Sequence, residues 1–350
     1  MQLQFFFTHL VFGLFLFGIS TLTAWTILKR SRVIDNPCYR SSHSTPIPTT
    51  GGLAIVFTFF LGMLIYAVLG NETMILSKYF LGFTFSSLLI AGISYYDDLK
   101  DKPLTIRLAT HTLGILTVIG FGIVINRIEH PLFDSSLMAI AGYFLTFMWI
   151  LGLTNAYNFM DGLNGMAGCN AVITAIFLCI ISFSQGSNFT YIVCYTIVAG
   201  TGGFLIFNYP KGKLFMGDVG STFLGFTFAV LAIISALYDN SHTSLMVMPL
   251  LLFHFIFDTF FTFMRRGLSR ENVFMAHRTH IYQLLNRLGM SHTRVTFIYM
   301  VLCIIQGMAA KWMLTIGGPE RTMVFLPFAL TYFGLAMVVV KKARRKGILG

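Results

Sequence analysis

The stretch YFLGFTFSSLLIAGISYY, residues 79–96, decides the fold, because it has no charged residue and is nearly long enough to cross a bilayer as a helix. It ends directly before the acidic pair Asp97 and Asp98. Similar apolar runs, each bounded by charged residues, Pro or Gly, recur along the whole chain. The pattern therefore predicts an all-α, polytopic membrane protein.

The composition supports this prediction. Of the 350 residues, 56% are hydrophobic and only 11% are charged, whereas globular proteins carry about 25% charged residues. A soluble fold of this size would lack the polar residues to cover its surface. About eleven transmembrane helices are predicted, over residues 4–28, 51–70, 79–96, 108–126, 136–154, 169–184, 189–209, 219–238, 244–264, 295–314 and 322–340.

Lys and Arg are unevenly divided between the two sides of these helices. If residues 29–50 are cytoplasmic, 20 of the 24 Lys and Arg residues lie in cytoplasmic segments. The positive-inside rule then predicts an outer N-terminus and a cytoplasmic C-terminus. The first run is followed, not preceded, by basic residues, so we expect a retained helix rather than a signal peptide. The net charge of +11 therefore indicates anionic lipid and phosphate partners, not nucleic acid.

Short loops carry most of the polar residues. We expect one transmembrane catalytic domain over residues 1–350, because no segment outside the predicted helices exceeds about 30 residues. The active site is expected at the cytoplasmic face, within the loops at about 29–50, 95–107, 155–168, 210–217 and 265–294. The five cysteines have no CxxC spacing and read as small apolar residues.

The first acidic motif is YYDDLKDKPLTIR, residues 95–107. Asp97, Asp98 and Asp101 are close enough for two carboxylates to share one helical face. Close anions need a counter-charge, which predicts cation binding or proton transfer. The alternative is a solvated helix end whose acids are neutralised by Lys100, Lys102 and Arg107.

The second motif is NAYNFMDGLNGMAG, residues 155–168. Asn155, Asn158, Asp161 and Asn164 recur every three residues, so on a helix they form one polar stripe at the membrane surface. A glycine-rich helix-packing seam is the alternative, but it leaves the asparagines without an explanation, since they are costly in lipid.

The third motif is FNYPKGKLFMGDVGSTFLGF, residues 207–226. Its Pro and Gly residues predict a tight turn into a helix that begins at about Val219, with Asp218 near the N-cap and backbone N–H groups free to face an anion. Lys211 and Lys213 add positive charge, and Phe215 offers an aromatic face. This arrangement suits a magnesium diphosphate site, while the alternative is a helix-capping Asp218.

Two further motifs are basic. The loop MAHRTHIYQLLNRLG, residues 275–289, contains His277, Arg278 and His280 and favours anion binding over zinc, because no HExxH-type base accompanies it. Its alternative is positive charge that only fixes the topology. RSSHSTPIPTTGG, residues 40–52, places Arg40 and His43 before a helix start, and a simple loop is equally consistent with it.

A transporter is the rival class of function. Asp258 lies inside the predicted span 244–264, one helical turn from His254, so the two are expected to form a buried polar pair. Transporter sites lie near the bilayer midplane, whereas the other acids of interest lie at span ends, which favours an enzyme.

These five motifs, in this order and on one face, resemble the polyprenyl-phosphate N-acetylhexosamine-1-phosphate transferase family, of the glycosyltransferase family 4 type. Its members are bacterial inner-membrane enzymes that move a sugar 1-phosphate from a UDP-sugar to a lipid phosphate such as undecaprenyl phosphate. The resemblance covers roughly residues 30–295 by motif. It implies Mg²⁺ as the cofactor, with Mn²⁺ as an alternative.

The resemblance also implies residue roles. Asp97 and Asp98 match an acidic pair implicated in metal binding or in deprotonating the lipid phosphate. Asp218 matches the metal ligand and Phe215 the aromatic residue that stacks on uracil. Asn158 and Asp161 match an NxxD motif, and the histidine loop is expected near the diphosphate. We therefore expect catalytic roles for Asp97, Asp98, Asp161, His277 and His280, substrate binding by Arg40, His43, Asn155, Asn158, Asn164, Phe215 and Arg278, and metal binding by Asp218 and Asp98.

Two departures bear on the branch of the family. The central motif reads DGLNG, with Asn164 where an acid is usual, and the three-histidine run of the MurNAc-pentapeptide branch is absent. The sequence therefore looks more like the branch that starts O-antigen or related surface glycans, with UDP-GlcNAc, UDP-QuiNAc or UDP-FucNAc as donor. The MurNAc-pentapeptide phosphotransferase of peptidoglycan synthesis remains the alternative within the family, and a homodimer is left open.

Overall fold

The fold is a bundle of helices with one very small sheet. The computed structural model describes residues 2–37, 45–69, 78–100, 104–127, 135–239, 241–273, 275 and 277–349. Its helices are α1 (Gln2–Arg30), α2 (Gly52–Leu69), α3 (Lys78–Lys100), α4 (Leu104–Gly120), α5 (Ser135–Phe159), α6 (Met166–Ser184), α7 (Asn188–Asn208), α8 (Gly217–Leu237), α9 (Val247–Leu251), α10 (Phe253–Leu268), α11 (Ile281–Arg287), α12 (His292–Met313), the 3₁₀ helix η2 (Gly318–Val324) and α13 (Phe325–Arg345). The all-α prediction is confirmed.

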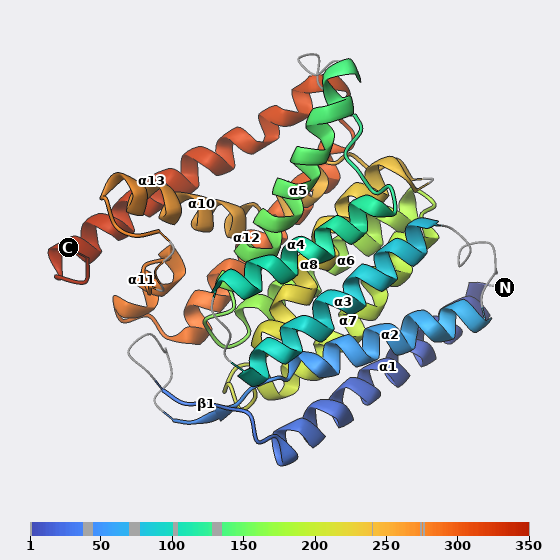
Figure 1. The fold of residues 1–350 in the computed structure, drawn as a ribbon, viewed down its shortest axis with the longest axis horizontal. Coiled ribbons are helices and arrows are strands. Elements are labelled where there is room, and N and C mark those ends of the chain that lie inside the picture. The colour runs from blue at the N-terminus through green and yellow to red at the C-terminus, as the bar shows by residue number, and fades with distance from the viewer. Residues whose placement is uncertain are drawn as a thin grey trace.

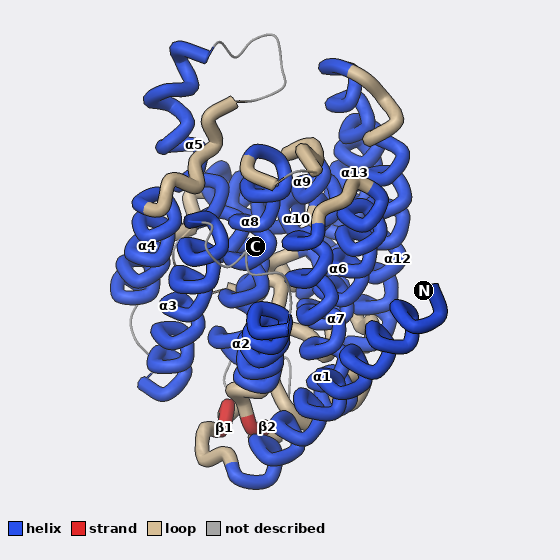
Figure 2. The backbone as a smooth tube through the Cα atoms, turned by 90° about the vertical axis from the view of Figure 1, so that its right-hand side faces the viewer, coloured by secondary structure: helices blue, strands red, loops and turns tan. Residues whose placement is uncertain are grey.

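The sheet has two residues in each strand. β1 (Ile34–Asp35) pairs with β2 (Ile47–Pro48) in antiparallel fashion, with Ile34 opposite Pro48. Figure 2 shows the two strands at the bottom of the bundle, below α2. They tie the exit of α1 to the entrance of α2, which brings β2 next to the loop before α8, where Phe215 N donates to Pro48 O at 2.9 Å.

Each of the eleven predicted spans contains a helix. Among the described residues, nine helices are long and apolar enough to cross a membrane, including α6, whose predicted range was the shortest. The described part of α4 is a shorter apolar helix, Thr105–Gly120.

The predicted continuous span 244–264 is wrong, because the helix breaks at Leu252 between α9 and α10. The amide of Gln306, on α12, lies at the break. In the amide orientation that places its oxygen near His254 N, Gln306 accepts from His254 N at 3.2 Å. Its amide nitrogen then donates to Leu251 O at 3.2 Å. A side chain that inserts into the hydrogen-bond ladder in this way is a common cause of a helix break.

Helix α8 forms the centre of the bundle, packed against α2, α3 and α5 (Figure 2). Its residues from Val219 to Ala236 are all buried, and Phe223, Phe226 and Phe228 are each 0% exposed. A helix that is apolar on all sides is expected only in such a position. Residues at the N-terminus of α8 are therefore fixed in place by the helices that surround α8.

The two ends of the bundle differ. Figure 1 shows the N-terminus at one end, and β1, α11 and the C-terminus at the opposite end. The chain places the C-terminal ends of α3 and α5 and the N-terminal end of α8 at this second end, because consecutive long helices run in opposite directions. The acidic motifs are thereby gathered on one side of the molecule.

Candidate active site

A single arginine joins two of the predicted acids. Arg107, near the start of α4, lies with its Nε 2.5 Å from Asp97 Oδ2 and with its Nη1 2.7 Å from Asp218 Oδ2. The three residues come from α4, from the last turn of α3 and from the first turn of α8. A guanidinium can contact two carboxylates at once because its donors are spread over a planar fork. Arg107 thus neutralises both acids in one place.

The neighbouring acid, Asp98, has a different task. Its Oδ1 accepts from Asp218 N at 2.9 Å and its Oδ2 accepts from Val219 N at 3.0 Å, so it caps α8 from outside. The expectation that these N–H groups are free for a ligand is therefore wrong: an internal carboxylate already occupies them. Gly217, with φ of +73°, permits this contact, since a Cβ there would lie 2.7 Å from Asp98 Oδ2.

An asparagine from α5 completes the surroundings of Asp218. Asn158 Nδ2 donates to Asp218 Oδ1 at 2.9 Å and to Ser221 Oγ at 2.9 Å. With one carboxylate oxygen bound to Arg107 and the other to Asn158, the Asp218 side chain is fixed in a single orientation. Asn155 donates instead to Leu151 O, one turn back on its own helix, at 2.7 Å.

The predicted polar stripe over 155–168 does not form, because α5 ends at Phe159 and α6 begins at Met166. Gly165, with φ of +74°, makes the turn between them, and its N–H donates to Asn208 Oδ1 at 2.8 Å. Asp161 lies in this turn. Burial raises its pKa well above the usual range, and the carboxylates of Asp218 and Asp98 raise it further. Asp161 is therefore part of the same electrostatic cluster.

Two predicted substrate-binding residues make contacts outside this cluster. Asn164 Nδ2 donates to Pro210 O at 3.1 Å, so its amide ties the turn after α5 to the turn before α8. Phe215 is half-buried, and its backbone bonds to Pro48 and Gly51. Both stay predictions as substrate contacts. Arg40, His43 and Asp101 lie outside the described residues.

A small pocket opens between these elements. It is lined by Ser94, Asp97, Arg107, Thr110, His111, Asn155, Asn158, Phe159, Asp218 and Thr222. The predicted site residues among them are Asp97, Asn155, Asn158 and Asp218. Arg107 and His111 were missed as site residues, although they lie one turn apart on one face of α4 and Arg107 is the last residue of the acidic motif. That spacing was the available signal.

The histidine loop, residues 277–289, forms a second group beside the pocket. Its His277 and His280 rings are 4.9 Å apart, and the His280 ring lies 5.9 Å from that of Phe159, which also lines the pocket. Burial lowers the pKa of His277 to about 3, assisted by His280, Arg266 and Arg265. His277 Nδ1 accepts from Thr279 N at 3.4 Å, as a neutral imidazole can.

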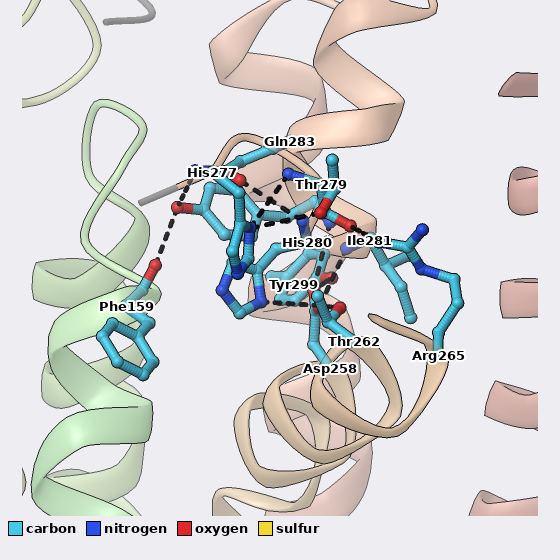
Figure 3. A network of polar contacts seen from close by, with 11 residues as sticks. Phe159, Asp258, Thr262, Arg265, His277, Thr279, His280, Ile281, Gln283 and Tyr299 are labelled. Atoms are coloured by element: carbon cyan, nitrogen blue, oxygen red, sulfur yellow. Dashed lines mark hydrogen bonds and ion pairs between the residues drawn. The ribbon is translucent and has the colours of Figure 1, made fainter. Parts of the chain in front are cut away.

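The predicted polar pair between His254 and Asp258 is wrong. Both side chains are buried, but His254 Nδ1 lies 2.6 Å from the Gln306 amide and Nε2 lies 3.0 Å from Asn170 Oδ1. The Asp258 carboxylate accepts instead from Ile281 N at 2.8 Å and from Tyr299 Oη at 2.7 Å. It thus faces the histidine loop, as Figure 3 shows.

The donor set bears on metal binding. Within the described ranges, no group of three or more His, Cys, Asp and Glu side chains converges on one point. Asp97 and Asp218 do converge, and they share Arg107 as counter-charge. Mg²⁺ in nucleotide sites is commonly held by one or two carboxylates, with substrate phosphates and water completing its shell. Asp97 and Asp218 are carboxylates of the kind that hold such an ion beside a phosphate.

Comparison with known proteins connects this arrangement to a family. Residues 80–236 match the model of glycosyl transferase family 4. The chain is 27% identical to a Bacillus subtilis (strain 168) protein named probable undecaprenyl-phosphate N-acetylglucosaminyl 1-phosphate transferase, covering 84% of both chains. It is 27% identical to a decaprenyl-phosphate N-acetylglucosaminephosphotransferase of Mycobacterium leprae (strain TN), covering 91% of this chain and 86% of the relative. It is 26% identical to an undecaprenyl-phosphate alpha-N-acetylglucosaminyl 1-phosphate transferase of Yersinia pestis, covering 97% and 92%.

Proposed function

We propose that this protein transfers an N-acetylhexosamine 1-phosphate from a UDP-sugar to undecaprenyl phosphate, because residues 80–236 match the model of glycosyl transferase family 4 and the relatives are named for such transfers. The reaction releases UMP and starts a lipid-linked glycan. The names of the relatives make UDP-N-acetylglucosamine the first donor to test. Initiation of O-antigen or a related surface glycan is proposed over the MurNAc-pentapeptide reaction, because the three-histidine run is absent from the sequence.

The Asp97–Arg107–Asp218 arrangement carries this proposal. It stands at the end of the bundle that we assign to the cytoplasmic face, where 20 of 24 Lys and Arg residues lie by the predicted topology. A polyprenyl phosphate stays in the bilayer and a UDP-sugar stays in water, so their phosphates meet only at such an interface. The buried Asp97, the half-buried Asp218 and Arg107 lie where that meeting is expected.

The proposed chemistry is a phosphoryl transfer. An oxygen of the lipid phosphate attacks the β-phosphorus of the UDP-sugar, the bond from that phosphorus to the bridging oxygen breaks, and UMP leaves with the bond's electron pair. Such a step depends on charge neutralisation and alignment more than on covalent participation of the protein. Arg107 supplies positive charge to this site, and Asn158 and Asp98 hold Asp218 and its helix in place.

We propose that Mg²⁺ is held by Asp218, with Asp97 as the partner that the geometry favours. When bound, the ion would neutralise the diphosphate and the departing UMP. Asp98 was expected from sequence as the second ligand, and it stays a prediction in that role; in the structure it accepts from two backbone N–H groups of α8. Its contribution here is to position Asp218.

The test compares Asp218→Asn with Asp239→Asn in purified protein. Asp239 is a hydrogen-bonded acid just beyond the opposite end of α8, where its carboxylate accepts from Thr190 Oγ1 at 3.2 Å. We expect Asp218→Asn to lower transfer of radiolabelled sugar phosphate by about 10²–10³-fold or more, as for loss of a group that stabilises developing charge. Asp239→Asn should retain near-normal rates. Full activity of Asp218→Asn would contradict the role given to this pocket.

The donor is identified by the same assay. UDP-GlcNAc, UDP-QuiNAc and UDP-FucNAc are supplied in parallel with undecaprenyl phosphate, and both UMP and the lipid-linked product are measured. An enzyme of the proposed class releases UMP only when donor and acceptor are both present. Absence of UMP with every donor would favour the transporter class instead.

A further inference from the structure

Asp258 is the most buried acid among the described residues for which the exposed fraction is given, and the predicted catalytic set does not include it. Its side chain is 1% exposed and lies on α10. The Oδ1 atom accepts from Ile281 N at 2.8 Å and Thr262 Oγ1 at 3.3 Å, and Oδ2 accepts from Tyr282 N at 3.1 Å and Tyr299 Oη at 2.7 Å. Figure 3 shows Thr262, Ile281 and Tyr299 gathered around the Asp258 carboxylate.

A buried carboxylate is costly unless its oxygens are well supplied with donors. Here the donors come from three separate elements: α10 itself, α12 through Tyr299, and the first residues of α11 through their backbone. The backbone N–H groups cannot reverse their role, so an amide at position 258 would turn an NH₂ group toward a fixed donor. The site therefore requires an acceptor-only side chain.

The same carboxylate reaches the histidine loop. His280 Nδ1 lies 3.4 Å from Asp258 Oδ1. Two residues after His280, Tyr282 Oη donates to Phe159 O at 2.8 Å, and Phe159 lines the pocket of Asp218. Gly162, in the turn that holds Asp161, leaves the space that the Tyr282 hydroxyl occupies, since a Cβ there would be 2.2 Å from that hydroxyl. The loop is thus fixed on one side by Asp258 and on the other by the end of α5.

We infer that Asp258 is a positioning residue for the proposed transfer: by binding the backbone of Ile281 and Tyr282 and the ring of His280, it holds the histidine loop against the pocket of Asp218. The effect of Asp258 on transfer rests on the proposed function. The anchoring of the histidine loop by Asp258 does not. Asp258 acts through His280 and touches no reacting atom.

Anchoring is measured without any substrate by hydrogen–deuterium exchange of the full-length protein in detergent. In Asp258→Asn, peptides covering residues 277–289 should exchange at least about tenfold faster, while peptides of α8 keep their protection. Asp239→Asn is the matched control, because it also converts a hydrogen-bonded acid to an amide. Asp239 lies just beyond the C-terminal end of α8, away from the histidine loop. Unchanged exchange at 277–289 in Asp258→Asn would overturn the inference. An equal rise throughout the molecule would overturn it too, since it would indicate only general destabilisation.

The consequence is measured by a double-mutant cycle with His280→Ala. Misplacement of a loop can cost about 10²-fold without any change in the reacting groups, so Asp258→Asn should reduce kcat/KM for the UDP-sugar by roughly 10–100-fold. If it acts through His280, the double variant should be no slower than the slower single variant. Multiplied losses would overturn the coupling.

Two further outcomes separate this inference from the proposed function. Should the wild-type protein transfer no sugar phosphate, the proposed function fails, while the exchange measurement still decides whether Asp258 anchors the loop. Should transfer proceed normally in an Asp258→Asn variant whose loop exchanges fast, the anchoring stands and the positioning role is refuted.

Discussion

Arg107 is the residue that connects the two acids of the pocket. Its removal leaves Asp97 and Asp218 facing each other with no guanidinium between them. We expect Arg107→Gln to lower the transfer rate by roughly tenfold or more and Arg107→Lys to fall between it and the wild type. A lysine keeps the charge but cannot contact both carboxylates through a planar fork. The measurement is radiolabelled transfer at saturating donor, and wild-type rates in Arg107→Gln would refute the bridge.

Asp161 gives a prediction on stability and pH. Burial and the carboxylates of Asp218 and Asp98 raise its pKa in the folded protein, whereas an unfolded Asp ionises at about 3.9. The folded state therefore binds this proton more tightly, and the contribution of Asp161 to stability falls as pH rises above about 4. Asp161→Asn should raise the Tm by a few degrees at pH 8 without Mg²⁺ while lowering activity, and the difference in Tm should vanish toward pH 4.

Glu320→Gln is the control for this prediction, since Glu320 is exposed and lies in η2, in the segment before α13. Its Tm should match the wild type at every pH. The difference in Tm between Asp161→Asn and the wild type is expected to shrink on acidification. A difference that grows instead would show that the effect has the opposite sign.

At the residue scale, sequence could point to Asp97, Asn158 and Asp218 because each stands in a short polar break between apolar runs. It did not assign Arg107 to the site, because Arg107 was expected only as one of three cations that neutralise a solvated helix end. Nor could it assign Asp258, because the donors on its carboxylate come from Ile281, Tyr282 and Tyr299, which are 23 to 41 residues away. Contacts of that kind follow from tertiary packing alone.

At the scale of elements, the close contact of α2 with α8 controls where Asp218 stands. A Cβ on Gly220 would lie 2.3 Å from Met216 Cγ and 2.7 Å from the Cα of Gly52 on α2. Gly220→Ala should therefore force the helices apart, two residues from Asp218. We expect a loss of stability of about 1–3 kcal/mol, typical of overpacking, together with a marked loss of transfer activity.

The matched control for this substitution is Gly92→Ala on α3. A Cβ at Gly92 would meet nothing within 4 Å, and the residue is exposed, so the change should alter stability by no more than about 1 kcal/mol. Thermal unfolding in detergent and radiolabelled transfer are measured for both variants. Equal behaviour of Gly220→Ala and Gly92→Ala would contradict the close packing of α2 on α8.

The elements themselves were largely predictable, and the reasons for the failures are physical. Apolar runs locate helices in a membrane because the backbone must satisfy its own hydrogen bonds there. The break at Leu252 was not visible, because it depends on Gln306, which lies on another helix. Helix α5 ends at Phe159, five residues beyond the predicted end at residue 154, and the polar stripe does not form because the spacing of polar residues continues across a glycine turn. A regular spacing of polar residues defines one face of a helix only where those residues form an unbroken helix.

At the scale of the whole molecule, the proposed function depends on which side of the membrane the pocket of Asp218 faces. Figure 1 places the two termini at opposite ends of the bundle, with the C-terminus at the end that carries α11 and β1. UDP-sugars are cytoplasmic, so the proposal requires that this end faces the cytoplasm. The charge distribution predicts the same orientation, since the cations of the last turn of α13 and the following residues lie there.

This orientation is tested by single cysteines at the two ends of α13. Glu320 and Lys346 are both exposed, and the 21 residues of α13 between them span about 30 Å. In a Cys38→Ser background, a membrane-impermeant maleimide should label Glu320→Cys in intact cells and Lys346→Cys only after the membrane is permeabilised. Cys169, Cys194 and Cys303 are buried and should stay unlabelled in both cases. The reverse pattern would place Asp97, Arg107 and Asp218 on the outer face, away from the nucleotide sugar, and the proposed transfer would then be impossible however well the pocket binds phosphate.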